Sequence, residues 1–208
     1  MDIQQIFQNN QEWVHEKLGK DPNYFKTLAE GQSPEILYIG CSDSRATAEG
    51  LMGLGPGDVF VHRNIANVVS NLDVSALSVI NYAVVHLKVN HVVVCGHYYC
   101  GGVKAAMGAA DLGILNPWLR NIRDVYRLHQ DELDKIEKED DRYKRLVELN
   151  VQEQCANVLN NIDVQRTQRE RPVTVHGWVF DIGTGNLIDL NISHEQATNG
   201  TEAIYRQD

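Results

Sequence analysis

The sequence of 208 residues has no uninterrupted apolar run near the roughly 18 residues that a membrane-spanning helix needs. A signal peptide is also missing, because a basic start and an apolar stretch do not occur in the first residues, MDIQQIFQNNQEW. We therefore expect a cytoplasmic protein with no membrane among its partners.

Positive charge is scarce, with 19 Lys and Arg against 28 Asp and Glu and a formal net charge of −9. Such a chain offers no broad basic surface to phosphates, which argues against nucleic acid as a partner. Hydrophobic residues make up 43% of the chain and charged residues 23%, an ordinary globular composition. The length suits one compact domain, which we predict over residues 1–208.

Cysteine is scarce as well. Four cysteines in a chain of this size do not make a disulfide scaffold, and a reducing compartment keeps them as thiols. Metal binding or catalysis is then the question for each of them. A lone cysteine or histidine is usually an ordinary core or surface residue, and we interpret five residues in this way: Cys155, His86, His91, His129 and His176.

The N-terminal segment predicts a helical arm. Apolar residues over 3–17 are spaced as in an amphipathic helix, and Asp21-Pro22 marks a break before a second, short helix. The arm has too little local core to stand alone. We therefore predict that residues 1–30 pack on a partner subunit, in a homodimer or a dimer of dimers.

The middle of the chain alternates apolar strands with helices. Short apolar runs at 36–39, 58–62 and 91–95 predict buried strands, and the apolar spacing over 75–87 predicts a core-facing helix. Continuously apolar strands separated by helices are typical of a parallel sheet with helices on both faces. Ligands of such sheets bind at the carboxyl ends of the strands.

The rest of the chain predicts further helices and a hairpin. We expect helices over 101–110, from Pro117 to about His129, and over 131–159, where the charged first half faces solvent. Strands at 173–180 and 186–192 flank a Gly-Thr-Gly turn and predict a β-hairpin. The predicted fold class is α/β, with a mainly parallel central sheet, helices on both faces, an N-terminal helical arm and a C-terminal β-hairpin extension.

Reactive side chains gather where three predicted strands end, in the segments 41–45, 62–64 and 95–102. Thiolate sulfur and imidazole nitrogen are ligands that zinc prefers, and His97 and Cys100 can converge on one ion from a turn that opens a helix. A helix N-terminus lowers the pKa of a thiol, so we expect Cys100 to ionise readily and to bind as a thiolate. With Cys41 as the third ligand, the sequence predicts one Zn²⁺ per chain.

The fourth position on the zinc has three candidates. Cys95 would complete a closed structural site, although its place at the end of a Val-Val-Val-Cys strand suits a core residue. Asp43 would bind the zinc directly, or would bind Arg45 through paired hydrogen bonds and leave the position to water.

Two motifs, Cys41-Ser-Asp-Ser-Arg45 and His97-x-x-Cys100-Gly-Gly, resemble the paired motifs of the β-class carbonic anhydrases. Segments 60–67 and 176–180 are also similar to family segments, and the similarity covers most of the chain. The resemblance implies zinc ligands at Cys41, His97 and Cys100, and a catalytic dyad of Asp43 and Arg45. Asp43 is also the conditional fourth ligand of a closed state. The glycine pair, which permits close approach, is the predicted substrate contact: Gly101 and Gly102.

Some members of this family hold a regulatory bicarbonate at a second site with a tryptophan, an arginine and a tyrosine. Here Arg63 stands in the arginine position, but Tyr38 replaces the tryptophan and Phe180 replaces the tyrosine. These replacements remove an indole N–H and a phenolic hydroxyl, two donors for an anion. The sequence therefore carries the regulatory site only in part.

The resemblance implies reversible hydration of carbon dioxide to bicarbonate and a proton. Zinc lowers the pKa of its bound water towards about 7, and the hydroxide attacks carbon dioxide while Asp43 accepts a hydrogen bond from it. His62 is a candidate for moving the proton to solvent.

Three alternatives stay open. The first is a non-catalytic zinc protein with a closed Cys3His site. The second is a family relative that acts on another small substrate, such as carbon disulfide. The third is a thiol phosphatase with Cys41 as nucleophile, although its Cys-x5-Arg motif differs in spacing from Cys41-x3-Arg45.

Overall fold

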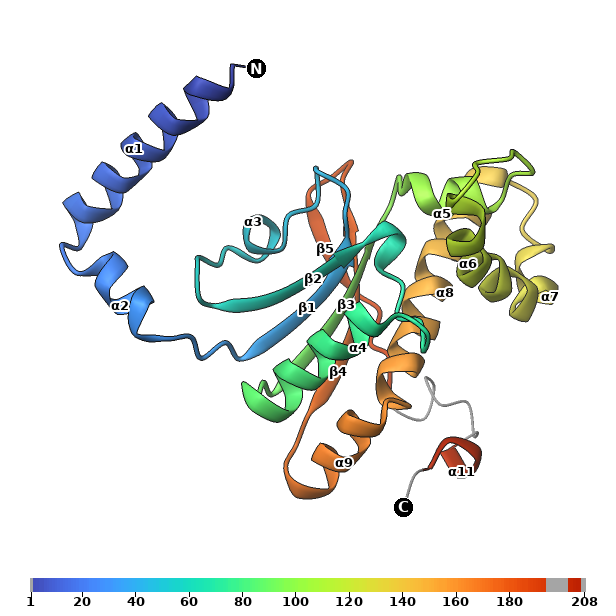
Figure 1. Ribbon diagram of the computed structural model, residues 1–208. Coiled ribbons are helices and arrows are strands. Elements are labelled where there is room, and N and C mark those ends of the chain that lie inside the picture. The colour runs from blue at the N-terminus through green and yellow to red at the C-terminus, as the bar shows by residue number, and fades with distance from the viewer. Residues whose placement is uncertain (1, 194–201, 207–208) are drawn as a thin grey trace. The chain divides into compact units, whose positions relative to one another are not determined.

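The computed structural model describes residues 2–193 and 202–206, and Figure 1 shows the path of the chain. The chain divides after Ser33 into two compact units. The strands are β1 (Ile36–Cys41), β2 (Val59–Asn64), β3 (His91–His97), β4 (Thr174–Asp181) and β5 (Asn186–Asp189). The helices are α1 (Ile3–Lys20), α2 (Tyr24–Glu30), α3 (Ala48–Met52), α4 (Val74–Asn81), α5 (Gly101–Ala106), α6 (Leu115–Leu128), α7 (Gln130–Leu133), α8 (Glu139–Leu159), α9 (Ile162–Glu170) and α11 (Glu202–Tyr205).

The N-terminal unit consists of α1 and α2, so the predicted helical arm with a break before a second helix is confirmed. Asp2 caps α1 by accepting a hydrogen bond from the backbone N–H of Gln4, and Lys17 and Lys20 lie in the last turn, where the helix dipole favours positive charge. The ring of Trp13 packs edge-on against Tyr24 and Phe25. Neither helix buries a residue within this unit, so its apolar side chains are left without a core.

The larger unit is built on a five-stranded sheet in the order β2-β1-β3-β4-β5. The first four strands are parallel and β5 runs antiparallel to β4, which confirms both the parallel sheet and the hairpin. β1 and β3 run further than predicted and end at Cys41 and His97 themselves. Both residues therefore lie at the carboxyl edge of the sheet, where Cys41 is opposite Asn64 and His97 is opposite Phe180.

One face of the sheet carries the main core. Leu37, Ile39, Val92 and Val94 are completely buried on this face, among apolar side chains from α4, α6 and α8. α8 contacts β3 and β4 directly. Side chains alternate across a strand, so every second residue of β1 and β3 points away from this core.

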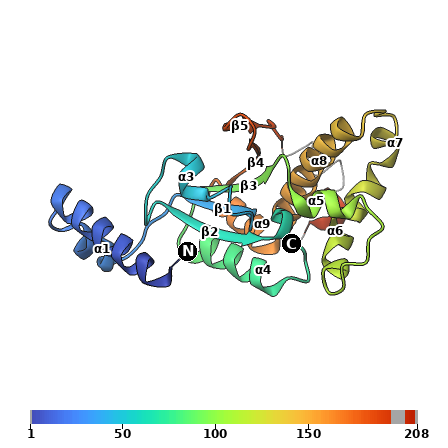
Figure 2. The same cartoon turned by 90° about the horizontal axis from the view of Figure 1, so that it is seen from above.

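The opposite face carries a smaller cluster of Tyr38, Val93 and Cys95, which packs on Ala48 of α3. Figure 2 shows α3 on one side of the sheet and α4 on the other. Helices thus lie on both faces, as predicted. The helix on this second face covers little of the sheet, however, because α3 is only five residues long. Trp178 and Phe180 of β4 are therefore only partly buried on this face.

Several helices differ from the predictions. The predicted helix over 75–87 is α4 followed by a π-helical turn, η2 (Tyr82–His86), and the helix predicted over 101–110 ends at Ala106. The prediction of one helix over 131–159 is wrong, because the chain leaves the helical path after α7 and α8 begins at Glu139. Acidic residues fill the first turn of α8, where exposed backbone N–H groups favour negative charge. The short helices α3 and α9 were not predicted.

No helix in the part of the chain that the structure describes has the length and apolar character needed to cross a membrane.

Candidate metal centre

Three buried side chains converge at the carboxyl edge of the sheet. Cys41 ends β1, His97 ends β3, and Cys100 directly precedes α5. Their ligand atoms all lie within 4.8 Å of one another. The two Sγ atoms are 4.0 Å apart, near the separation of about 3.8 Å that two thiolates on one tetrahedral zinc would have. The three predicted zinc ligands therefore meet in one place.

The orientation of His97 fits a metal ligand. Its Nδ1 lies 2.9 Å from the carbonyl oxygen of Tyr98, and since a carbonyl only accepts, this nitrogen carries the proton. Its Nε2 is buried and has no hydrogen-bond partner among the described residues. A buried nitrogen left without a partner is costly unless something binds it. The lone pair of Nε2 is thus available on the side where the two thiols lie.

The two thiols differ in their ionisation. The hydrogen bond shared with Cys100 lowers the pKa of Cys41, against burial, and the bond from the backbone N–H of Ala66 acts in the same direction. The same shared bond, together with burial, raises the pKa of Cys100. Between the two thiols Cys41 therefore ionises first, whereas the sequence pointed to Cys100. The bond shared with Cys41 and burial raise the pKa of Cys100 more than the backbone N–H groups at the start of α5, a helix of six residues, lower it.

Asp43 and Arg45 form a tightly bonded dyad beside the cluster. Arg45 donates from Nε to Oδ1 of Asp43 over 2.9 Å, from a terminal nitrogen to Oδ2 over 2.7 Å, and from its backbone N–H over 3.0 Å. It also donates to the carbonyl of Tyr99 over 3.2 Å. This guanidinium holds the pKa of Asp43 well below its usual range, against the effect of burial. Asp43 Oδ2 lies 3.8 Å from His97 Nε2, so the carboxylate stands next to the cluster while bonded to Arg45.

Arg63 fixes the loop that carries the dyad. Its guanidinium donates to the carbonyl oxygens of Cys41, Asp43 and Ala46, at 2.8, 2.5 and 3.1 Å. Tyr38 and Phe180, the other two residues matched to the regulatory site, belong to the cluster on the second face of the sheet. Burial raises the pKa of Tyr38, which is 1% exposed. Nε and one terminal nitrogen of Arg63 are thus already bonded to the backbone.

Cys95 lies on the other side of the sheet from Cys41. Strand alternation places Cys95 with Tyr38 and Val93, whereas Cys41 belongs to the main core. The group of ligand atoms found among the described residues does not include Cys95. Burial raises the pKa of this thiol to about 12, so it stays protonated at neutral pH. These facts favour the interpretation of Cys95 as a core residue.

Replacing Cys95 by valine should therefore leave the zinc content and the activity unchanged. Valine is of similar size, so the stability should change by less than about 1.5 kcal/mol. Metal analysis of the purified variant, beside Cys100→Val as a control that should lose zinc, checks this. Loss of zinc from Cys95→Val would instead support the closed Cys3His site.

The glycine pair divides into two roles. No atom of the described residues lies within 4 Å of the place that a Cβ on Gly101 would take, and Gly101 lines a pocket of about 420 Å³ with Cys100, Lys104 and Tyr143. Gly102 packs against the segment after β2, where a Cβ would stand 2.7 Å from Cγ2 of Ile65. Gly101 therefore opens a route to Cys100, and Gly102 permits close packing.

The remaining candidates lie apart from the cluster. His62 is buried, its ring bonds to Asn64 over 3.2 Å, and burial lowers its pKa. Cys155 is completely buried in the core, His129 pairs with Glu153 over 2.8 Å, and the rings of His91 and His176 bond each other over 3.1 Å. Within the described residues, none of these side chains joins the group of ligand atoms formed by Cys41, His97 and Cys100.

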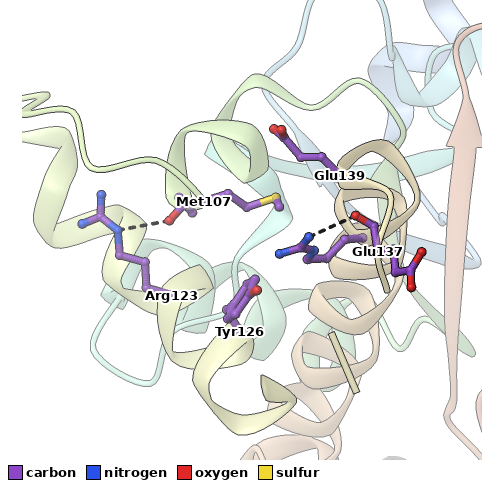
Figure 3. A pocket seen from close by; sticks show the side chains of 7 residues that line it. Met107, Arg123, Tyr126, Glu137 and Glu139 are labelled. Carbon is purple, nitrogen blue, oxygen red and sulfur yellow. Dashed lines mark hydrogen bonds between the residues drawn. The ribbon is translucent and has the colours of Figure 1, made fainter. Parts of the chain in front are cut away.

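A second pocket, of about 630 Å³, lies between α5, α6 and the start of α8 (Figure 3). Its two arginines donate to backbone carbonyls, Arg123 to Ala106 and Arg142 to Glu137. It is larger than the pocket at Gly101, but none of the three clustered residues lines it. The chemistry of the lining, and not its volume, identifies the candidate site.

Sequence reasoning missed the groups that hold the cluster in place, since it named Arg63 only as a match to the regulatory site. They are the carbonyls of Tyr98 and Tyr99, the N–H of Ala66 and the guanidinium of Arg63. Three of the four are backbone atoms, which every residue carries, so no residue type signals them. Tyr99 adopts a left-handed conformation with φ 62°, which only coordinates reveal.

Two cysteines and one histidine on an α/β sheet, with a carboxylate beside the remaining position, are typical of a catalytic rather than a structural zinc site. Comparison with known proteins agrees with a zinc enzyme and identifies its family. Residues 36–187 match the family model described as carbonic anhydrase. The chain belongs to the carbonic anhydrase family, and within it to the β class.

The similarity to individual relatives extends over almost the whole chain. A carbonic anhydrase of Emericella nidulans is 60% identical over 202 residues, which are 96% of this chain and 88% of that protein. The crystal structure of the β-carbonic anhydrase CafA of Aspergillus fumigatus has a TM-score of 0.91 at 43% identity, covering 99% of both chains. A structure from Sordaria macrospora, one of two tetrameric β-carbonic anhydrases, has a TM-score of 0.88 at 44% identity, covering 91% of this chain and 96% of that one.

Proposed function

We propose that this carbonic anhydrase hydrates carbon dioxide reversibly to bicarbonate and a proton, with one zinc ion per chain bound by Cys41, His97 and Cys100. Family membership supports the reaction. The observation that carries the zinc assignment is His97 Nε2, a buried nitrogen without a partner in the described part of the chain, beside two thiols of which one ionises easily.

Zinc in such a site acts as a Lewis acid that makes water a nucleophile near neutral pH. The part of Asp43 follows from its bonds. Both of its oxygens are bonded by Arg45, and Oδ2 faces His97 Nε2 across 3.8 Å. An ionised carboxylate only accepts hydrogen bonds, so Asp43 would accept a hydrogen bond from the attacking water and orient its lone pair towards the substrate. Arg45 keeps that acceptor charged and fixed.

Two groups shape the approach of the substrate. Gly101 leaves the end of the pocket at Cys100 free of side-chain atoms, so a small molecule reaches the site without displacing one. Arg63 holds the loop of Cys41 and Asp43 by three carbonyls, and therefore fixes a ligand and the dyad relative to each other. The positions of Cys41 and Asp43 are then fixed before the substrate binds, which favours a fast reaction.

The fourth position has two candidate occupants, water and Asp43. Asp43 in this structure is engaged by Arg45 through three hydrogen bonds, which supports water as the occupant when the dyad is formed. A closed state would require Asp43 to give up the paired bonds to Arg45. We propose that the competition between Arg45 and the metal for Asp43 decides whether the enzyme is active.

Stopped-flow measurement of carbon dioxide hydration at alkaline pH tests this function. The zinc-loaded protein should accelerate hydration, removal of zinc by a chelator should abolish the effect, and carbon disulfide should be a poor substrate in a parallel assay. A protein with one zinc per chain and no hydration activity would contradict the proposal. Activity confined to carbon disulfide would assign the chain to the alternative substrate.

We propose a homodimer or a dimer of dimers in which the arm, residues 1–30, packs on a partner subunit and completes the single zinc-enzyme domain. The apolar side chains of α1 support this: Ile3 is 67% exposed and Phe7 68% exposed, without a core in their own unit. Large exposed apolar side chains in a row mark interaction surfaces. We also propose a cytoplasmic enzyme, which the four free thiols support.

Replacing Ile3 and Phe7 together by glutamate should shift the protein to a smaller assembly, because two charges would enter an apolar contact. Size-exclusion chromatography with light scattering measures the change. The matched control, Gln4→Glu with Gln8→Glu, adds the same charge at exposed polar positions of the same helix. An unchanged mass for the first variant, or a monomeric wild type, would contradict packing of the arm on a partner.

A further inference from the structure

The segment after β2 forms a strained turn next to the cluster. Ala66 has φ 63° and ψ 33°, and Asn67 has φ 49°, so two successive residues with a Cβ adopt the left-handed conformation. This conformation is unfavourable for alanine, and it persists only where the surroundings impose it. Ala66 is completely buried, and its N–H donates to Sγ of Cys41 over 3.4 Å. The strained turn is therefore hydrogen-bonded to Cys41, a metal ligand of the proposed site.

Two buried amides of α8 hold this turn. Nδ2 of Asn150 donates to the carbonyl of Ala66 over 3.0 Å, and Nε2 of Gln154 donates to Oδ1 of Asn150 over 3.2 Å. Oε1 of Gln154 in turn accepts the N–H of Val69 over 2.8 Å. Asn150 is 1% exposed and Gln154 2% exposed, in a helix whose other buried residues are mostly apolar. Burying two side-chain amides is costly unless they are hydrogen-bonded. Both amides bond to the backbone of the segment after β2, Asn150 at Ala66 and Gln154 at Val69.

The neighbours of Ala66 are fixed independently of α8. The indole N–H of Trp118 donates to the carbonyl of Ile65 over 2.8 Å, and the amide of Asn64 both donates to and accepts from the backbone of Val68. From the other side Gly102 packs closely, since a Cβ there would stand 3.3 Å from Cβ of Ala66. The peptide that carries the Ala66 N–H is thus held at its Ile65 carbonyl by Trp118, and the bond from Asn150 holds the next peptide, between Ala66 and Asn67. The two bonds together fix the left-handed φ and ψ of Ala66.

We infer that Asn150 is a positioning residue for the metal centre: it holds the left-handed Ala66–Asn67 turn, which aims the Ala66 N–H at the sulfur of Cys41. The inference rests on the proposed zinc site. An N–H directed at a thiolate draws charge from the sulfur and fixes its direction, and outer partners of this kind tune a metal and its ligands. Asn150 touches neither metal nor substrate and acts through the backbone of Ala66.

The variant Asn150→Leu tests this, because leucine has a similar size and no donor. Cobalt(II) replaces zinc, and the thiolate-to-cobalt charge-transfer band is recorded together with the rate of zinc release to a chelator. Loss of the N–H bond raises the energy of the sulfur electrons, so the band should move to longer wavelength. Zinc release should become faster by on the order of 10-fold. Asn150→Ser, whose hydroxyl is too short to reach Ala66, should give the same shifts if the leucine variant does not fold.

The control is Asn161→Ala, which removes the cap of α9 and so lowers stability away from the site. It should lower the melting temperature and leave the cobalt band unchanged. Asn150 variants that bind cobalt with an unshifted band and release zinc at the wild-type rate would overturn the inference and leave the zinc site standing. A wild-type protein without any charge-transfer band would overturn both.

Discussion

Replacing His97 by alanine should abolish zinc binding and with it the hydration of carbon dioxide. His97 supplies one of three ligand atoms, and the remaining thiols, 4.0 Å apart, leave half of a tetrahedral site open. The loss of kcat/KM should exceed the roughly 100-fold that removal of an outer partner of a metal ligand costs. Metal analysis and stopped-flow assays of the purified variant measure the two effects together.

The matched control for this variant is His129→Ala. His129 is also a largely buried histidine, bonded to Glu153 over 2.8 Å, but it lies outside the cluster. The control should keep its zinc and its activity. Full zinc occupancy and activity in His97→Ala would show that the metal and the reaction are elsewhere.

Replacing Asp43 by asparagine should lower kcat while zinc stays bound. The amide keeps the shape of the side chain, but it offers Arg45 one oxygen in place of two and presents N–H groups where the water should donate. Loss of the hydrogen bond that orients the attacking water should cost about 10²-fold in rate. Since Arg45 holds the pKa of Asp43 well below its usual range, the wild-type carboxylate stays ionised from mildly acidic to alkaline pH. The ratio of the two rates should therefore be constant over this range.

Asp124→Asn is the control for the loss of a carboxylate bound to arginine. Asp124 is bonded by Arg120 and Arg127, and these bonds also lower its pKa, but it lies on α6 away from the cluster. Its activity should equal that of the wild type. An Asp43→Asn enzyme with a wild-type kcat would contradict the role of Asp43, and a loss of zinc would make Asp43 a ligand.

The convergence of Cys41, His97 and Cys100 could be predicted from the sequence because these residues end strands or lie just after one. Apolar runs end at Cys41 and His97, and the carboxyl ends of parallel strands share one edge of a sheet, so their convergence followed from topology. Cys100 was tied to His97 by a spacing of three residues. The structure also places Cys95 and Cys41 in different clusters, on opposite faces of the sheet. The sequence alone left Cys95 as a candidate fourth ligand.

The parts that escaped prediction depend on backbone conformation or on distant contacts. The left-handed turn at Ala66 carries no glycine to signal it, and Asn150, 84 residues away, is an ordinary amide in an otherwise amphipathic stretch. The start of α8 was hidden because Glu139, Asp140 and Asp141 were interpreted as part of an exposed face and not as the acidic first turn of a new helix. The commitment of Arg63 to three carbonyls likewise needs coordinates.

X-ray absorption at the zinc edge of the purified protein counts the sulfur ligands of the metal. We expect one zinc per chain with two sulfur ligands, one imidazole and one light atom, from Cys41, Cys100, His97 and water or Asp43. Three sulfur ligands would bring Cys95 into a closed site, and they would contradict an open catalytic zinc.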